Sequence, residues 1–268
     1  MGDTLLYAGV DVGSATTKAV WIDAGGAVLG SCVLPSGGNL ADAARRCLGT
    51  AAERTGGVPD PGARIVATGY GRERVTERSR AVTEITCHAR GARALLPEAQ
   101  SVIDIGGQDS KAIALDARGR VLRFEMNDKC AAGTGRFLEV MARLLEIDLN
   151  DLGARALAAK APVTISSTCT VFAESEVISH LAQNQAVDDI VAGLCRAIAS
   201  RVYGLVSRAR LAAPTIMTGG VARNQGVVKA MEAQLGYAIQ VPDSPQTVGA
   251  YGAALIALDD GMQEGAEK

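Results

Sequence analysis

Short apolar runs and amphipathic stretches alternate along this chain, which predicts a mixture of buried strands and packed helices. Strands are predicted where apolar runs end in polar or glycine-rich turns, at 5–10, 101–103 and 215–217. Helices are predicted where apolar residues recur at helical spacing or where Ala and Gly are dense, at 137–145, 225–235 and 247–258. The pattern therefore indicates an α/β fold.

A duplicated turn organises these elements. The segment from Asp11 to Val20 aligns without a gap with the segment from Asp104 to Ile113, and a D-A-x-G turn follows each copy. Each copy reads as a strand, a D-x-G turn, a second strand, another turn and a third strand. We therefore predict two similar subdomains, one formed by 1–98 with 249–268 and the other by 99–248.

The repeated turn suits the phosphates of a nucleotide. A strand that ends in Asp11 or Asp104 presents a carboxylate to a metal-bound phosphate, and the backbone at Gly13 and Gly106 can approach the phosphate oxygens. Lys18 can neutralise phosphate charge. A single D-G turn is common in ordinary hairpins, so one copy alone would favour that interpretation. The two copies together favour a phosphate clamp.

A third glycine-rich turn follows the strand at 215–217. Its backbone at Gly219 and Gly220 can lie against a ribose or adenine, and the chain contains neither G-x-x-x-x-G-K-[ST] nor a strand-linked G-x-G-x-x-G. The order D-x-G-x-x-x-x-K, D-I-G-G-Q-D-S-K and M-T-G-G-V-A-x-N resembles the phosphate and adenosine motifs of the actin, sugar kinase and Hsp70 superfamily. That resemblance implies a duplicated, ribonuclease H-like α/β ATPase with ATP between its two subdomains.

Charge and composition restrict the partners. The formal net charge is −2 and aromatic residues make up 3% of the chain, so we expect no nucleic-acid partner. The opening apolar run has no basic segment before it and is far shorter than a membrane span. We expect a cytoplasmic protein that does not enter a membrane, with His88 and His180 in packing or surface roles.

Two of the six cysteines stand in unusual surroundings. Cys130 and Cys169 are each expected just before a helix, whose positive end favours the thiolate form that binds metal. Two thiolates are too few for a tetrahedral zinc site or an iron–sulfur cube, whereas a symmetric dimer supplies four. Buried structural thiols and a disulfide within one chain remain alternatives on spacing alone.

The sequences around these two cysteines are more specific than their spacing. N-D-K-C-A-A-G-T-G-R-F-L-E and I-S-S-T-C-T-V-F-A-E-S-E-V-I-S closely resemble the cysteine motifs of the activators of 2-hydroxyacyl-CoA dehydratases, a family that includes the ATPase subunits of ATP-dependent benzoyl-CoA reductase. The resemblance implies an oxygen-sensitive homodimer with one 4Fe-4S cluster bridging its subunits. Ferredoxin or flavodoxin would reduce this cluster, and single electrons would pass to a partner iron–sulfur protein at the expense of ATP.

The resemblance also assigns residues. Cys130 and Cys169 match the cluster ligands. The residues expected to be catalytic, through Mg²⁺, the γ-phosphate or the attacking water, are Asp11, Asp104, Gln108 and Asp109. The residues expected to bind ATP or ADP are Gly13, Ser14, Ala15, Thr16, Thr17, Lys18, Gly106, Gly107, Gly219, Gly220, Asn224 and Gln246.

Several functions fit this pattern. The expected electron acceptor is a 2-hydroxyacyl-CoA dehydratase, with benzoyl-CoA reductase or a double-cubane cluster protein as alternatives. A small-molecule kinase of the same fold and an actin-type assembly protein are alternatives from other classes, and both would contain no iron. The mixed-charge segment 72–80 reads as a solvated face that can help to dock an acidic electron carrier.

Overall fold

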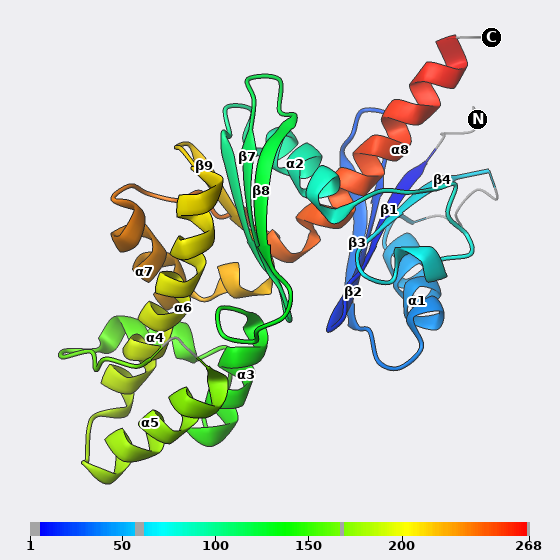
Figure 1. The fold of residues 1–268 in the computed structure, drawn as a ribbon. Coiled ribbons are helices and arrows are strands. Elements are labelled where there is room, and N and C mark those ends of the chain that lie inside the picture. Colours follow the sequence, from blue (N-terminus) through cyan, green and yellow to red (C-terminus); the bar gives the residue numbers. More distant parts are fainter. Residues whose placement is uncertain (1–5, 57–61, 167–168, 267–268) are drawn as a thin grey trace. The chain divides into compact units, whose positions relative to one another are not determined.

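The computed structural model describes residues 6–56, 62–166 and 169–266 (Figure 1). Leu5 of the first expected strand and Ser167 and Thr168 of the second cysteine motif lie outside these residues. The chain divides into two compact units. The first comprises Met1–Ala99, Leu115–Val121 and Gln246–Lys268, and the second comprises Gln100–Ala114 and Leu122–Pro245.

The first unit is built on a five-stranded sheet in the order β3-β2-β1-β4-β5. Its strands are β1 (Tyr7–Val12), β2 (Thr16–Ile22), β3 (Val28–Pro35), β4 (Arg64–Thr68) and β5 (Arg80–Ala81). Its helices are α1 (Leu40–Glu53), the 3-10 turn η1 (Arg72–Arg74), α2 (Glu84–Leu95) and α8 (Val248–Ala266). Every residue of β1 is buried, because α1 and α8 both pack against this strand.

Small residues let α8 approach the first sheet closely. A Cβ at Gly9 of β1 would lie 2.0 Å from the carbonyl oxygen of Ala250, and a Cβ at Gly252 would lie 1.8 Å from that of Cys87 on α2. Only glycine fits such approaches. The Ala- and Gly-rich composition that predicted a closely packed terminal helix is thus confirmed, and the helix extends beyond the expected end at 258.

The second unit holds a four-stranded sheet in the order β8-β7-β6-β9. Its strands are β6 (Ser101–Ile105), β7 (Ser110–Leu115), β8 (Val121–Asn127) and β9 (Thr215–Thr218). Its helices are α3 (Gly135–Leu144), α4 (Leu152–Ala158), α5 (Thr170–Ala182), α6 (Val187–Ala209) and α7 (Gln225–Leu235), with the short turn η2 (Gly220–Arg223); a further short turn, η3, spans Pro245–Thr247. The expected helix at 225–235 is confirmed.

Helix α6 is the centre of the second unit's core. It is long and apolar enough to span a membrane by length and composition alone, but 67% of its most apolar window is buried inside the protein. Its side chains Ile190, Leu194 and Ile198 belong to one apolar cluster with Phe137 and Met141 of α3. This burial is typical of the core helix of a globular protein.

The two sheets repeat one arrangement. In each, three consecutive strands form an antiparallel meander, and the first of the three pairs in parallel with a later strand, β1 with β4 and β6 with β9. The two predicted three-strand meanders are therefore confirmed. Both D-x-G turns occupy the same place, between the first and second strands of each meander.

Candidate functional site

The first D-x-G turn is closed by its own backbone. Asp11 lies in β1, where it is register partner of Lys18 in β2, and Lys18 Nζ donates to Asp11 Oδ2 at 3.1 Å. The Gly13 N–H donates to the carbonyl of Thr16 at 3.1 Å. A Cβ at Gly13 would lie 2.8 Å from the same oxygen, so the turn requires glycine there. Asp11 itself is almost completely buried.

Ser36, which was not among the expected site residues, supports this turn through hydrogen bonds. Ser36 Oγ donates to the carbonyl of Gly13 at 2.6 Å, and its N–H donates to that of Ala15 at 3.0 Å. Thr17 Oγ1 lies 2.9 Å from Ser36 Oγ inside the core, whereas Ser14 is exposed and Thr16 is half-buried. The expected row of phosphate-binding hydroxyls is therefore divided, with that of Thr17 engaged internally.

The segment 67–72 closes over Asp11. Gly69 has φ +92°, and a Cβ there would lie 2.5 Å from Asp11 Oδ1 and 2.6 Å from the carbonyl of Val12. The Gly71 N–H donates to the Val12 carbonyl at 2.8 Å. The G-x-G spacing in this segment is the signal that could have marked it as part of the site, because both glycines face the strand that carries the carboxylate.

The second D-x-G turn repeats this pattern and adds a carboxylate. Asp104 of β6 and Lys111 of β7 are register partners, and Lys111 Nζ donates to Asp104 Oδ2 at 3.3 Å and to Asp109 Oδ2 at 2.6 Å. The Gly106 N–H donates to the carbonyl of Asp109 at 2.9 Å, and a Cβ at Gly106 would lie 2.6 Å from Asp109 Oδ1. Gln108 at the tip is exposed.

The third glycine turn packs directly on the second. Thr218 Oγ1 donates to Asp104 Oδ1 at 2.8 Å. Gly219 has φ +87°, and a Cβ there would lie 2.3 Å from the carbonyl oxygen of Ile105 and 2.9 Å from Asp104 Oδ1. Gly220 begins η2 directly afterwards. The structure therefore brings the expected adenosine and phosphate motifs of the second unit together.

Asn224 has a structural task in this arrangement. It is the N-cap of α7, and its Oδ1 accepts from the Val227 N–H at 3.1 Å. Its buried Nδ2 has no hydrogen-bond partner among the residues that the structure describes. Gln246 belongs to the first unit. Nucleotide contacts by Asn224 and Gln246 stay predictions.

The loop that carries Cys130 is fixed by side-chain and backbone hydrogen bonds. Asn127 Nδ2 donates to the carbonyl of Cys130 at 2.8 Å, and its Oδ1 accepts from the Cys130 N–H at 3.3 Å. Ser110 Oγ donates to the carbonyl of Gly133, where φ is +91°. Asn127 and Ser110 were not among the expected site residues, although both stand in the quoted motifs.

Cys130 was expected just before a helix, in a loop that runs into it, and it lies in the loop that leads into α3. Helix α3 begins at Gly135, and the N–H groups of Gly135 and Arg136 donate to the carbonyls of Gly106 and Gly107, each at 2.8 Å. Helix starts need acceptors for such N–H groups, and here the second D-x-G turn supplies them. The Cys130 loop is thereby joined to that turn through backbone, and the thiol lies several residues from the start of the helix.

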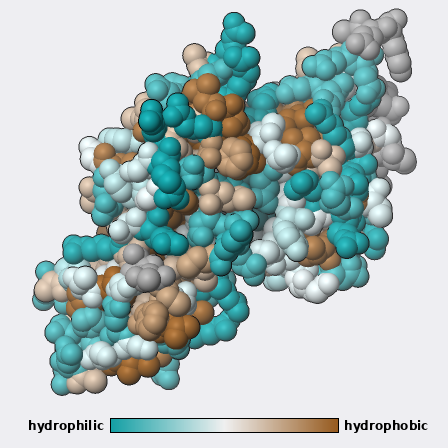
Figure 2. All heavy atoms as spheres, viewed as in Figure 1, coloured by the Kyte–Doolittle hydropathy of each residue, from teal (hydrophilic) through white to brown (hydrophobic). Residues whose placement is uncertain are grey.

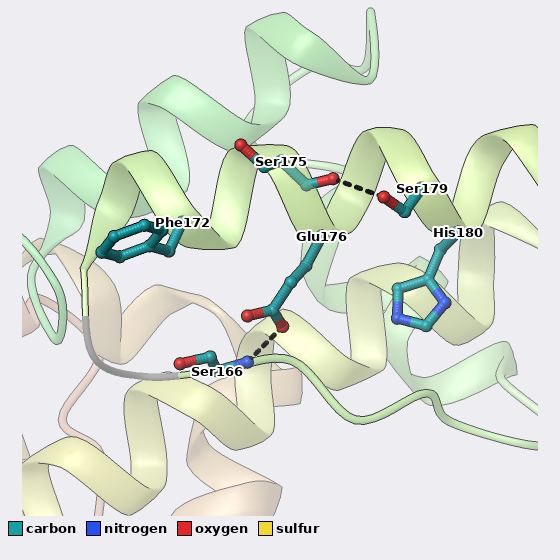
Figure 3. A pocket seen from close by; sticks show the side chains of 6 residues that line it. All are labelled: Ser166, Phe172, Ser175, Glu176, Ser179 and His180. Atoms are coloured by element: carbon teal, nitrogen blue, oxygen red, sulfur yellow. Dashed lines mark hydrogen bonds between the residues drawn. The ribbon is translucent and has the colours of Figure 1, made fainter.

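Cys169 lies where the sequence predicted it, as the N-cap of α5, with its carbonyl accepting from the Ala173 N–H at 3.0 Å. Figure 3 shows the Glu176 side chain reaching from α5 to the backbone of Ser166, whose N–H it accepts at 2.5 Å. His180, one turn further on, has its Nε2 3.3 Å from the carbonyl of Thr164. The segment before Cys169 is thus tied to its own helix.

Burial separates these two cysteines from the other four. Cys130 and Cys169 are half-buried. Cys32, Cys47, Cys87 and Cys195 are buried, and burial raises the pKa of Cys87 and of Cys195 to about 12. The four buried thiols are therefore packing residues.

The carboxylates of the D-x-G turns suit Mg²⁺, and the two half-buried cysteines suit an iron–sulfur cluster. Asp11 and Asp104 offer carboxylate oxygens, the ligand type that Mg²⁺ prefers. Among the described residues, no group of three or more His, Cys, Asp or Glu side chains gathers as a metal site. Cys130 and Cys169 of one chain therefore fit a four-thiolate cluster only if a second copy supplies the other two ligands.

Comparison with known proteins decides the family. Residues 8–257 match the BadF/BadG/BcrA/BcrD ATPase family. This chain belongs to that family. This BadF/BadG/BcrA/BcrD ATPase is 46% identical over 255 residues to the 2-hydroxyisocaproyl-CoA dehydratase activator of Clostridioides difficile, an alignment that covers 95% of the chain and 96% of the relative. The expected family is therefore confirmed.

Solved structures confirm the fold of this BadF/BadG/BcrA/BcrD ATPase. The activator of the 2-hydroxyisocaproyl-CoA dehydratase from Clostridium difficile with bound ADPNP has a TM-score of 0.94 and 44% identity, with 98% of each chain covered. A glucokinase of the ROK family from Streptomyces griseus has a TM-score of 0.56 at 15% identity, with 95% of this chain and 99% of that chain covered. The duplicated actin-like and sugar-kinase-like architecture is the one that the sequence predicted.

Proposed function

We propose that this protein is an ATP-hydrolysing activator that passes low-potential electrons, one at a time, to an iron–sulfur dehydratase of 2-hydroxyacyl-CoA substrates. The observation that carries the proposal is the backbone connection between the second phosphate turn and the Cys130 loop, at Gly106, Gly107, Gly135 and Arg136. The similarity to a dehydratase activator supports it.

The nucleotide chemistry falls to the two repeated turns. Asp11 and Asp104 would hold Mg²⁺, directly or through water, and Gln108 and Asp109 would orient the attacking water. This water forms a bond to the γ-phosphorus while the bond to the β-phosphate oxygen breaks, giving ADP and phosphate. Lys18, paired with Asp11 but still partly accessible, would offset phosphate charge. The remaining expected nucleotide residues keep their proposed binding roles, except Thr17, whose hydroxyl is engaged by Ser36 in the core.

The cysteines would hold the electron-carrying group between two copies of the chain. Cys130 and Cys169 from each subunit would supply the four thiolates of one 4Fe-4S cluster. When bound, such a cluster accepts and releases one electron at a time, at a potential set by its exposure and by hydrogen bonds to its sulfurs. Asn127 would fix the Cys130 backbone, and Glu176 would fix the segment before Cys169.

An uncovered apolar face beside Cys169 supports the dimer. Val171, Phe172 and Ile178 of α5 are 66%, 64% and 52% exposed. Figure 2 shows apolar surface gathered over α3 and α5. Side chains of this size are usually covered when they cluster, and a second copy approaching the two cysteines would cover them.

The effect of ATP binding and hydrolysis would be transmitted to the Cys130 loop through the start of α3. A change at Gly106 and Gly107 on binding or hydrolysis alters the acceptors of the first α3 N–H groups, so the Cys130 loop must adjust with them. Hydrolysis would make the electron transfer directional. Ferredoxin or flavodoxin would be the donor, and the acceptor would alternatively be benzoyl-CoA reductase or a double-cubane cluster protein. The expected cytoplasmic location stays a prediction.

Iron analysis tests the proposal. Protein purified without oxygen should contain about four iron and four sulfide per dimer, and C130S or C169S should lose them. C32A removes a buried thiol of β3 and is the matched control, which should keep the iron. A protein that remains iron-free after anaerobic reconstitution, yet hydrolyses ATP, would refute the redox role and favour a kinase of the same fold.

A further inference from the structure

We propose that Lys111 is a positioning residue of the nucleotide site, which holds Asp104 and Asp109 in place and offsets their charge so that metal and nucleotide bind together. The inference rests on the proposed function, because it takes the second D-x-G turn as part of the ATP site. Lys111 was not among the residues expected from the sequence.

One ammonium group holds two carboxylates here. Lys111 Nζ lies 2.6 Å from Asp109 Oδ2 and 3.3 Å from Asp104 Oδ2. The Lys111 side chain is 3% exposed and that of Asp104 is 5% exposed, so neither charge is well solvated. A buried charge persists only when it is paired and hydrogen-bonded. The three groups therefore form one electrostatic unit with a net charge of one negative.

The equivalent lysine of the first turn is arranged differently. Lys18 pairs with Asp11 at the same register and at 3.1 Å, but its side chain is 15% exposed. The first D-x-G turn has no counterpart of Asp109, since Thr16 stands at the corresponding position of the gapless alignment. Burial and the second carboxylate thus separate the two lysines: Lys18 can reach a phosphate, whereas Lys111 is enclosed and faces carboxylates.

The geometry around Asp104 leaves it little freedom. Its Oδ1 accepts from Thr218 Oγ1 at 2.8 Å while its Oδ2 accepts from Lys111, and the Gly219 backbone lies directly against it. Asp104 is therefore oriented from two sides before any metal arrives. Its contribution to Mg²⁺ depends on this orientation, because Mg²⁺ demands near-ideal octahedral geometry.

Removing the positive charge of Lys111 should change the affinities for Mg²⁺ and for metal-free ADP in opposite directions. With K111M the turn gains one net negative charge, which repels metal-free ADP and attracts Mg²⁺. The ratio of the ADP dissociation constants without and with Mg²⁺ should therefore rise at least about tenfold, the effect of one charge on a unit charge about 12 Å away at an effective dielectric constant of about 20. A purely structural role would weaken both affinities equally and leave the ratio unchanged.

Isothermal titration of the dimeric, anaerobically purified protein with ADP, with and without Mg²⁺, measures this ratio directly. K229M is the matched control, because Lys229 is an exposed lysine of the same unit paired with Glu232, and its ratio should equal that of the wild type. The rate of ATP hydrolysis by K111M should also fall about 100-fold, since misplacement of a catalytic group by about 1 Å has that effect.

A ratio for folded K111M within twofold of wild type would overturn the proposal. If K111M does not fold, the double variant K111M/D109N restores the net charge and should fold, with a ratio within threefold of wild type. A raised ratio in that variant, or failure of both variants to fold, would also overturn the proposal. Wild-type protein that binds no ADP would instead refute the proposed function.

Discussion

Gly219 offers a sharp test of how the third turn supports Asp104. The residue has φ +87°, and a Cβ there would lie 2.3 Å from the Ile105 carbonyl oxygen. Gly236, which follows α7 in the same unit, has φ +78° with no heavy atom within 4 Å of its ideal Cβ. Gly236 is left-handed, with ψ 10°, whereas Gly219 has ψ 173°, a region that is almost exclusive to glycine. Substituting alanine at each position therefore compares ordinary left-handed strain in open space with stronger strain combined with a steric collision.

The expected magnitudes differ severalfold. At Gly236 an alanine held in the left-handed region costs about 1–2 kcal/mol, and at Gly219 an alanine held in the glycine-only region costs about 1–3 kcal/mol. About 0.5 kcal/mol of each cost is recovered from the unfolded state. At Gly219 the new methyl must also separate from backbone by about 0.7 Å to reach 3.0 Å, and such overpacking typically adds about 1–3 kcal/mol. We expect G219A to lose about 3–4 kcal/mol of unfolding free energy and G236A about 1 kcal/mol.

Urea unfolding followed by circular dichroism measures both losses, and titration with ADP in Mg²⁺ reports the site. G219A should lower ADP affinity at least about tenfold, because its methyl would collide with Asp104 Oδ1 and force it to move, whereas G236A should leave the affinity unchanged. Equal stability losses in the two variants, or unchanged ADP affinity in a folded G219A protein, would refute the close packing of the third turn against Asp104.

Three further outcomes are expected. In the native iron-free protein only Cys130 and Cys169 should react rapidly with a thiol reagent such as DTNB, because the other four cysteines are buried. All six cysteines should react in urea. Two additional fast-reacting thiols in the native protein would contradict this burial. G135A places a Cβ 3.1 Å from the Gly106 carbonyl oxygen. The rate of ATP hydrolysis should stay within about threefold of wild type, while the rate of ATP-dependent electron transfer should fall about tenfold. Equal losses of the two rates would disprove the coupling. F172D should convert the dimer to monomers in native mass spectrometry and lose the cluster iron. E174Q, at a half-buried position of the same helix, is the control, and a dimeric F172D would exclude this face.

Local sequence was sufficient for the elements whose signals are local. The D-x-G turns follow from glycine at Gly13 and Gly106, and α7 runs between its Asn224 cap and the left-handed Gly236. Helix α3 begins at Gly135 rather than at the expected 137, because its first N–H groups donate to Gly106 and Gly107, which stand far earlier in the chain. The sequence around a helix start does not reveal hydrogen-bond acceptors that come from a distant turn.

The missed site residues have a similar explanation. Ser36 contacts the first turn only because β3 returns beside β2, and Lys111 became notable only when its burial between two carboxylates was visible. The hydroxyl of Thr17 was expected to face phosphate, but the alternation of side chains along β2 turns it toward the core. The sequence motifs predicted which residues lie at the site, and tertiary packing determined which of their side chains face outward.

The packing of α8 on β1 has a consequence for synthesis of the protein on the ribosome. Tyr7, Val20 and Ile22 share their apolar cluster with Ala250, Ala254 and Leu255, so one face of the first sheet is completed by residues translated more than two hundred positions after Gly9. The second unit, Gln100–Ala114 with Leu122–Pro245, can emerge and fold meanwhile. Until α8 leaves the exit tunnel, the nascent chain presents an uncovered apolar sheet face, which is the kind of surface that chaperones hold.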